Sequence, residues 1–145
     1  MRKYAIGIDV GGTRIKLGLF DGGMQLVSEQ RHLTDKDASA TEIMAFLAQQ
    51  VNALLDNAGL SAGDVRGVGA AFPSSIDARR GVTLESRNIV ALNDQPVRDM
   101  LQARLDLPVY VDNDGNVAAL AEHRLGAGRG YDRSEEHTSE LQSRI

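Results

Sequence analysis

Residues 4–20 read Tyr-Ala-Ile-Gly-Ile-Asp-Val-Gly-Gly-Thr-Arg-Ile-Lys-Leu-Gly-Leu-Phe, and this stretch decides the fold. A short apolar run ends at Asp9, and a second run of residues that favour β-structure covers 15–20. Between the two runs lies Val-Gly-Gly-Thr, which is typical of a turn. We therefore predict a β-hairpin over this stretch.

The chain beyond the hairpin alternates strands with helices. Residues 26–33 mix apolar and polar positions in near alternation, which predicts a third, more exposed strand. Ser39 and Glu42 have the spacing of a capping box, and apolar residues then recur at helical spacing until Gly59, which can take the left-handed conformation past a helix end. Residues 65–72 are small or apolar and predict a buried strand reached by a helical crossover.

The remaining elements complete an α/β domain with a mixed sheet. After an irregular stretch, Pro96 stands where a first helical turn tolerates it, and an apolar stripe follows over 97–105. Residues 108–111 predict a further strand, and 116–125 predict a third helix. The order β-β-β-α-β-α-β-α resembles the ribonuclease H-like or actin-like ATPase domain.

Composition excludes several classes of protein. The 145 residues carry 42% hydrophobic and 25% charged residues, which is ordinary for one globular domain. A formal net charge of -4 argues against a general nucleic-acid or anionic-membrane surface. There is no cysteine, and the basic start lacks a signal-peptide core because Asp9 follows too soon. We therefore expect a cytoplasmic protein without nucleic-acid or membrane partners.

The hairpin turn carries the first chemical motif. Gly11 and Gly12 can leave backbone N–H groups free to point at phosphate oxygens, and Asp9 could hold Mg²⁺ through water. A bare Asp-x-Gly-Gly is more often a tight turn whose glycines only supply positive φ. That simpler interpretation leaves Thr13 and Lys16 unexplained.

The second motif lies where a strand is followed by a helix, in residues 109–122. Such strand ends expose groups to ligands in α/β proteins. A carboxylate here could accept the proton of a hydroxyl that attacks a γ-phosphate, and Asp114 is the candidate base. As an alternative, Asp112, Asn113 and Asp114 are helix caps and turn formers, although three polar residues are more than one cap needs.

Together the two motifs resemble those of the ROK family of sugar kinases and repressors, in collinear order over residues 1–132. The resemblance implies that Asp114 is the catalytic base and that Asn113 binds sugar hydroxyls. It also places Ser74 and Asn88 around the sugar. The residues that it places around the phosphates and the metal are Asp9, Gly11, Gly12, Thr13 and Lys16.

Two departures from the family pattern affect the sugar contacts. Residues 72–77 read Phe-Pro-Ser-Ser-Ile-Asp where the family commonly shows Pro-Gly-Pro, and no Trp follows Asn88. From the sequence alone, ordinary turn capping by their own side chains is favoured for both Ser74 and Asn88.

The end of the chain has a different character. Residues 133–145 resemble the translation of a sequencing-library adapter, so we expect a non-native tail in which His137 has no role; a polar helix or disordered terminus is the alternative. Residues 1–132 would then be an N-terminal lobe. Family members continue into a second lobe, where a structural zinc site would lie.

The resemblance implies ATP- and Mg²⁺-dependent phosphorylation of a hexose by a full-length, homo-oligomeric parent, with this fragment inactive. Glucose is the first candidate substrate, and N-acetylated hexosamines, mannose and fructose are open. A sugar-responsive repressor of the same family would need a DNA-reading module, which is not expected ahead of a strand that starts near Met1. Another actin-fold ATPase would turn over ATP without sugar.

Overall fold

The predicted hairpin forms in the computed structural model, which describes residues 2–113. Strand β1 (Tyr4–Val10) pairs antiparallel with β2 (Arg14–Phe20), from Val10 opposite Ile15 to Ala5 opposite Phe20. Strand β3 (Leu26–Leu33) continues the sheet antiparallel to β2. Its residues alternate between half-buried and exposed, as expected for the predicted outer strand.

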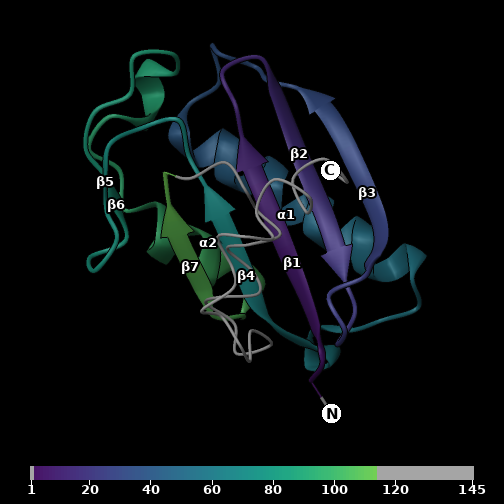
Figure 1. Ribbon diagram of the computed structural model, residues 1–145. Helices are drawn as coiled ribbons and strands as arrows, with labels where there is room; N and C mark the ends of the chain where they lie inside the picture. The colour runs from purple at the N-terminus through teal and green to yellow at the C-terminus, as the bar shows by residue number, and fades with distance from the viewer. Residues whose placement is uncertain (1, 114–145) are drawn as a thin grey trace.

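The second half of the sheet is parallel. Helix α1 (Ala40–Asn57) leads to β4 (Val65–Ala71), which pairs parallel with β1. Helix α2 (Val97–Leu105) leads to β7 (Val109–Asp112), which pairs parallel with β4. The strand order is β3-β2-β1-β4-β7, so the predicted mixed sheet is confirmed (Figure 1).

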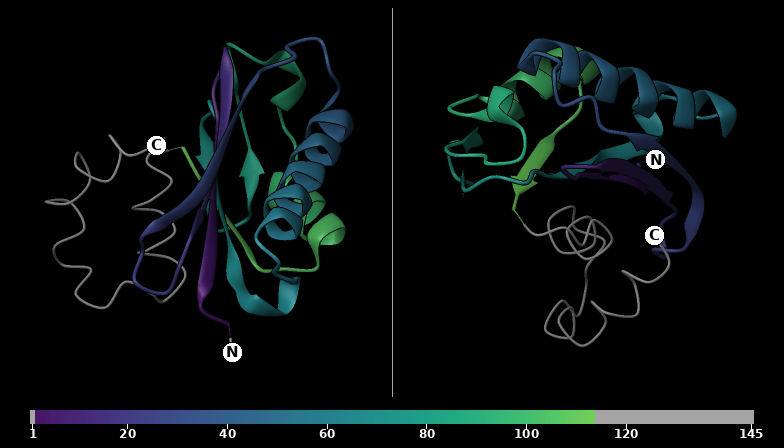
Figure 2. Two further views of the ribbon diagram at one scale, coloured as in Figure 1. Left: turned by 90° about the vertical axis from the view of Figure 1, so that its right-hand side faces the viewer. Right: turned by 90° about the horizontal axis from the view of Figure 1, so that it is seen from above.

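Both helices cover the same face of this sheet (Figure 2). Side chains alternate along a strand, and on β1 and β2 the large apolar ones, apart from Phe20 at the end of β2, point to the helices. They pack against the apolar stripe of α1 in one core, which includes Ile6, Ile8, Leu17, Ile43, Leu47 and Val51. The intervening residues therefore face away from the helices, and these include Asp9 and Lys16.

The helix ends follow local chemistry. Ser39 caps α1, since its side chain accepts a hydrogen bond from the Glu42 N–H and the Glu42 carboxylate accepts one from the Ser39 N–H. Gly59 has φ of 71°, which is the left-handed conformation predicted for the end of this helix. Pro96 precedes α2 as its N-cap, one residue earlier than the predicted first turn.

The connection from β4 to α2, residues 72–96, is more structured than predicted. It contains a small antiparallel pair, β5 (Ile76–Asp77) with β6 (Val82–Thr83), and a short 3-10 helix, η2 (Val90–Leu92). A second 3-10 helix, η1 (Ala62–Asp64), precedes β4. Two-residue strands are too short to produce an alternating pattern, so the sequence predicted only an irregular stretch.

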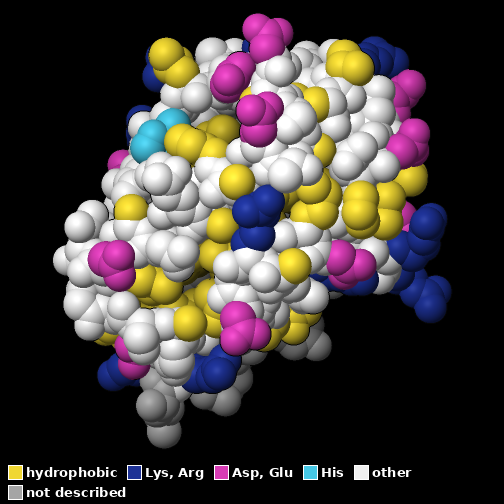
Figure 3. Space-filling model, turned by 180° about the vertical axis from the view of Figure 1, so that it is seen from behind, with side chains coloured by type: hydrophobic (Ala, Val, Ile, Leu, Met, Phe, Trp, Pro, Cys, Tyr) yellow, Lys and Arg dark blue, Asp and Glu magenta, His cyan; other side chains and the backbone are white. Residues whose placement is uncertain are grey.

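The surface on the helix side mixes acidic and basic side chains with small apolar patches (Figure 3). In the described part of the chain, no helix combines the length and the apolar character that a membrane span requires. The predicted helix over 116–125 and the predicted tail from residue 133 lie outside the described residues.

Candidate functional site

A row of charged residues crosses the sheet on the face opposite the helices. Register places Arg31 beside Lys16, Lys16 beside Asp9, and Asp9 beside Ala71. Ala71 in turn is beside Asp112 on β7. Since neighbouring strands are about 4.8 Å apart, the Cα atoms of Asp9 and Asp112 are separated by about 10 Å, with only a methyl group between them.

This row lies at the carboxyl ends of the three parallel strands. Strands β1, β4 and β7 run toward the same edge, where the hairpin turn and part of the β4–α2 connection also gather (Figure 1). Asp9 and Lys16 are half-buried and stand directly opposite each other. The structure thus places an acidic and a basic residue on neighbouring strands at the edge where α/β proteins bind ligands.

The donor set at Asp9 suits a hydrated cation. Within residues 2–113 there is no cluster of three His, Cys, Asp or Glu side chains that could hold a metal ion. A Mg²⁺ ion at Asp9 would therefore keep most of its ligands as water or phosphate oxygens, which is its ordinary preference.

In the glycine turn, residues 11–14, the expectation that both Gly11 and Gly12 leave their N–H groups free is wrong for Gly11. The Gly11 N–H donates to the Arg14 carbonyl at 2.8 Å, so it is not free to point at a phosphate. A Cβ on Gly11 would stand 2.7 Å from that carbonyl oxygen, and glycine is required here by the turn itself. Among the described residues, the Gly12 and Thr13 N–H groups donate to nothing and remain available for an anion.

Thr34, which immediately follows β3, fixes this turn from the side. Its N–H donates to the Thr13 carbonyl at 2.8 Å, and its hydroxyl donates to the Gly11 carbonyl at 2.8 Å. Sequence analysis missed Thr34, because a threonine after a strand carries no signal of a partner 23 residues earlier.

The turn also contacts a predicted sugar residue. A Cβ built on Gly12 would stand 3.1 Å from the Asn88 Cβ and 3.4 Å from its Nδ2 atom. Asn88 comes from the β4–α2 connection, far along the sequence. The structure therefore joins the predicted phosphate turn to the predicted sugar loop.

The turn-capping interpretation of Ser74 and Asn88 is wrong within the described residues. The Ser74 Oγ atom is buried without a hydrogen-bond partner, and the Asn88 side chain makes no hydrogen bond there. Other side chains cap these loops. The Asn93 Oδ1 atom accepts from the Ser86 N–H at 2.6 Å, and the Glu85 N–H donates to the Ser75 hydroxyl at 3.2 Å.

Ser86 links the two loops that carry Ser74 and Asn88. Its buried hydroxyl donates to the Pro73 carbonyl at 3.0 Å and accepts from the Ile89 N–H at 3.3 Å. Each of these partners is next to a predicted sugar residue in the sequence. The positions of both loops therefore depend on one hydroxyl that sequence analysis did not select.

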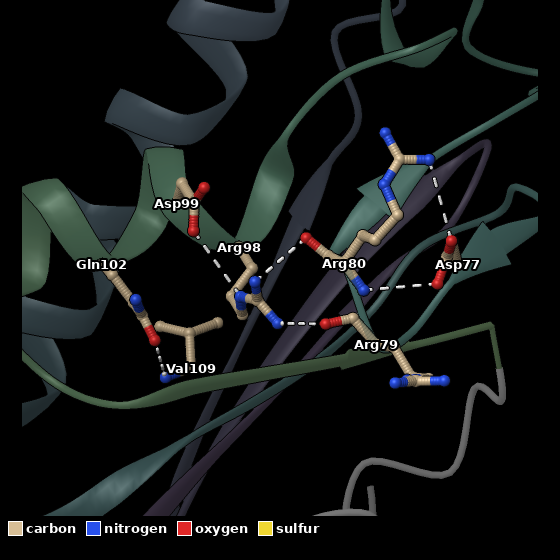
Figure 4. Close-up of polar contacts among 7 residues, drawn as sticks. All are labelled: Asp77, Arg79, Arg80, Arg98, Asp99, Gln102 and Val109. Atoms are coloured by element: carbon tan, nitrogen blue, oxygen red, sulfur yellow. Dashed lines mark hydrogen bonds and ion pairs between the residues drawn. The ribbon is translucent and has the colours of Figure 1, made fainter.

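Helix α2 holds the far end of the connection. The Arg98 guanidinium donates to the carbonyls of Arg79 and Arg80 at 2.9 and 3.0 Å, and Arg80 pairs with Asp77 at 3.7 Å (Figure 4). On the same helix, the Gln102 side chain accepts from the Val109 N–H at 3.0 Å and ties α2 to β7.

The second motif was predicted either to carry the catalytic base or to contain only caps and turn formers. The end of β7 supports the turn-forming role for Asp112. The Asp112 carboxylate accepts a hydrogen bond from the Asn113 N–H at 2.7 Å, which is the turn-forming role. Asn113 is exposed just beyond the strand. The predicted base, Asp114, lies outside the described residues.

The strand order and the crossover connections define a lobe of the actin-like ATPase fold. The chain belongs to the ROK family, whose model matches residues 5–134. It is 34% identical over 128 residues to a glucokinase of Halalkalibacterium halodurans, covering 88% of this chain and 38% of that relative. It is 41% identical over 116 residues to an N-acetyl-D-glucosamine kinase of Escherichia coli O139:H28, covering 80% and 36%.

Solved structures agree with the family. A ROK family glucokinase from Streptomyces griseus, in complex with glucose and AMPPNP, superposes with a TM-score of 0.65 at 35% identity, covering 88% of this chain and 38% of that one. A ROK family transcriptional regulator superposes with a TM-score of 0.66 at 15% identity, covering 78% and 28%, which is a likeness of fold alone. The chain thus spans less than two fifths of these relatives.

Proposed function

We propose that this chain is the N-terminal lobe, residues 1–132, of an enzyme that transfers the γ-phosphoryl group of ATP to a hydroxyl of a hexose. One observation carries the proposal: the glycine turn with its free N–H groups, the Asp9–Lys16 pair and Asn88 meet at one edge of the sheet. Phosphate-binding and sugar-binding groups must be neighbours for phosphoryl transfer.

Each group has a chemical task in this proposal. The Gly12 and Thr13 N–H groups donate to phosphate oxygens, and Lys16 compensates their negative charge. Asp9 would hold a hydrated Mg²⁺ ion, which would supply neutralisation of the negative charge on the nucleotide. These groups stabilise charge on the nucleotide but do not activate the sugar.

The sugar side combines residues from three loops. Ser74, Asn88 and Asn113 hold the sugar hydroxyls, and Asp114 accepts the proton of the attacking hydroxyl. The buried Ser74 hydroxyl supports this role, because it has no partner among the described residues and would gain one from a ligand. Glucose and N-acetylglucosamine are the first substrates to test, since the relatives that carry these names align over most of the chain.

The experiment is the variant Asp114→Asn in the full-length gene product. Asparagine keeps the shape of the side chain but cannot accept the proton, so kcat should fall by roughly a hundred- to ten-thousand-fold. The Kd for ATP, measured by titration calorimetry, should stay within about twofold of the parent value, because Asp114 does not bind the nucleotide in this proposal. Turnover close to that of the parent would refute the role of Asp114 as base.

A further inference from the structure

We infer that Thr34 is a positioning residue for nucleotide binding, which acts by fixing the glycine turn. The inference rests on the proposed function of that turn as the phosphate site. Thr34 touches no proposed substrate. Its contribution would be to hold the Gly12 and Thr13 N–H groups in one orientation before ATP arrives.

The hydrogen bonds of the turn show why a side chain is needed there. On one side the turn is closed by its own backbone, through the Gly11 N–H and the Arg14 carbonyl. The Gly11 carbonyl receives its hydrogen bond from the Thr34 hydroxyl instead, at 2.8 Å. The hydroxyl therefore supplies a bond to the first residue of the turn.

The position of Thr34 explains how it reaches two peptide groups. Leu33, the last residue of β3, is paired with Arg14, so Thr34 stands opposite Thr13 as the ladder continues. Its N–H takes the next ladder bond, to the Thr13 carbonyl. Its side-chain hydroxyl reaches the Gly11 carbonyl, just beyond the end of β1. One residue thus holds the carbonyls on both sides of Gly12.

This geometry occupies the carbonyl groups of the turn but leaves two of its N–H donors unpaired among the described residues. The carbonyls of Gly11 and Thr13 are both occupied by Thr34, whereas the N–H groups of Gly12 and Thr13 have no partner among the described residues. A flexible glycine pair would lose conformational entropy when it binds phosphate. Holding it beforehand removes part of that cost, so the effect should fall on nucleotide affinity.

The test is Thr34→Val in the full-length gene product, with Thr34→Ser beside it. Valine keeps the shape, the β-branching and the backbone N–H, and it removes only the hydroxyl. We expect the KM for ATP to rise by roughly three- to tenfold, the scale of one lost hydrogen bond, with the KM for the sugar within about twofold. Serine should restore the KM for ATP. Thr41→Val, the same change at an exposed position of α1, should change neither constant.

A second measurement addresses the turn directly in the 145-residue chain. Amide hydrogen exchange at Gly11 should be faster in Thr34→Val than in the parent chain and should return to the parent rate in Thr34→Ser. Faster exchange together with an unchanged KM for ATP would reduce Thr34 to a structural role and overturn the inference. Equal increases in both KM values would overturn it as well.

The variant Asp9→Asn separates the inference from the proposed function. If Asp9→Asn weakens the use of ATP but Thr34→Val does not, the inference fails and the proposed function stands. If Asp9→Asn also leaves kcat and the KM for ATP unchanged, the turn is not the phosphate site and both fail.

Discussion

Gly12, in the proposed phosphate turn, lies close to Asn88, the proposed sugar residue. A Cβ there would meet the Asn88 side chain at 3.1 to 3.4 Å, which is closer than side chains normally approach. Asn88 is exposed and can move, but it would leave the position from which the proposed function has it bind the sugar. In the proposed function, a glycine at this position therefore leaves room for Asn88 as well as for the approach of phosphate.

We predict that Gly12→Ala in the full-length gene product raises the KM for the sugar by more than it raises the KM for ATP. Steady-state kinetics with each substrate varied in turn gives both constants. Gly23→Ala is the matched control, since a Cβ there meets only the Asp21 carboxylate at 3.6 Å. A change confined to the KM for ATP would mean that the Asn88 contact has no part in sugar binding.

Gly81 is a second position where a side chain would clash with a neighbouring residue. Its φ is 70°, and a Cβ would stand 2.5 Å from the Arg98 Cβ. Gly59 has nearly the same φ, 71°, with nothing within 4 Å of a Cβ. The two glycines thus separate the cost of the backbone conformation from the cost of the contact.

We predict that Gly81→Ala lowers the free energy of unfolding of the 145-residue chain by more than Gly59→Ala does. Gly59→Ala should cost about 1 kcal/mol for the left-handed conformation alone. The contact with Arg98 should add about 1–3 kcal/mol. Urea unfolding measures both variants, and equal losses would show that Arg98 moves aside without cost.

At the scale of elements, α1 begins with a reciprocal cap that also depends on pH. Hydrogen bonds from the Ser39 backbone, and then from its side chain, lower the pKa of the Glu42 carboxyl below its ordinary value of 4.5. The ionised form is thus favoured in the folded state. Its contribution to stability is present above pH 4.5 and is lost as pH falls through the lowered value in the folded chain.

We predict that Ser39→Ala reduces the free energy of unfolding by about 1 kcal/mol at pH 7. Glu42→Gln should flatten the dependence of stability on pH in the acid range just below the ordinary glutamate pKa, without reversing it. Urea unfolding at a series of pH values measures both effects. A Glu42→Gln profile parallel to that of the parent would show that the cap does not couple to this titration.

Strong local patterns made the main elements predictable from the sequence. The capping box fixed the start of α1, and the two apolar runs around the glycine pair fixed the hairpin. The β5–β6 pair was not predicted, because it is held in place by tertiary contacts such as the hydrogen bonds from Arg98 to the Arg79 and Arg80 carbonyls. Such contacts have no periodicity that a sequence could display.

Motifs could select candidate site residues, but the sequence could not predict their arrangement. Motifs selected Asp9, Lys16 and Asn88, yet only the strand register brings Asp9 opposite Lys16, and only the fold brings Asn88 to Gly12. Thr34 and Ser86 act through single hydroxyls on distant carbonyls, and the sequence offered no signal for either.

At the scale of the whole molecule, the proposed function gives the described residues one side of a site for two substrates. The chain covers 38% of the length of the Halalkalibacterium halodurans glucokinase. One side of such a site alone would neither exclude water nor align a γ-phosphate with a hydroxyl. We predict that the 145-residue chain consumes no ATP in a sugar-dependent manner in a coupled assay for ADP. Sugar-dependent turnover by this chain alone would mean that the site is already complete.

The measurement that tests the central claim most directly is ³¹P NMR of the full-length gene product with ATP and Mg²⁺, in the presence and absence of glucose or N-acetylglucosamine. The proposed function predicts that a hexose phosphate resonance grows in step with ADP, and that ADP formation nearly stops without sugar. ATP hydrolysis to inorganic phosphate at the same rate with and without sugar would contradict it and would make the protein a different kind of ATPase.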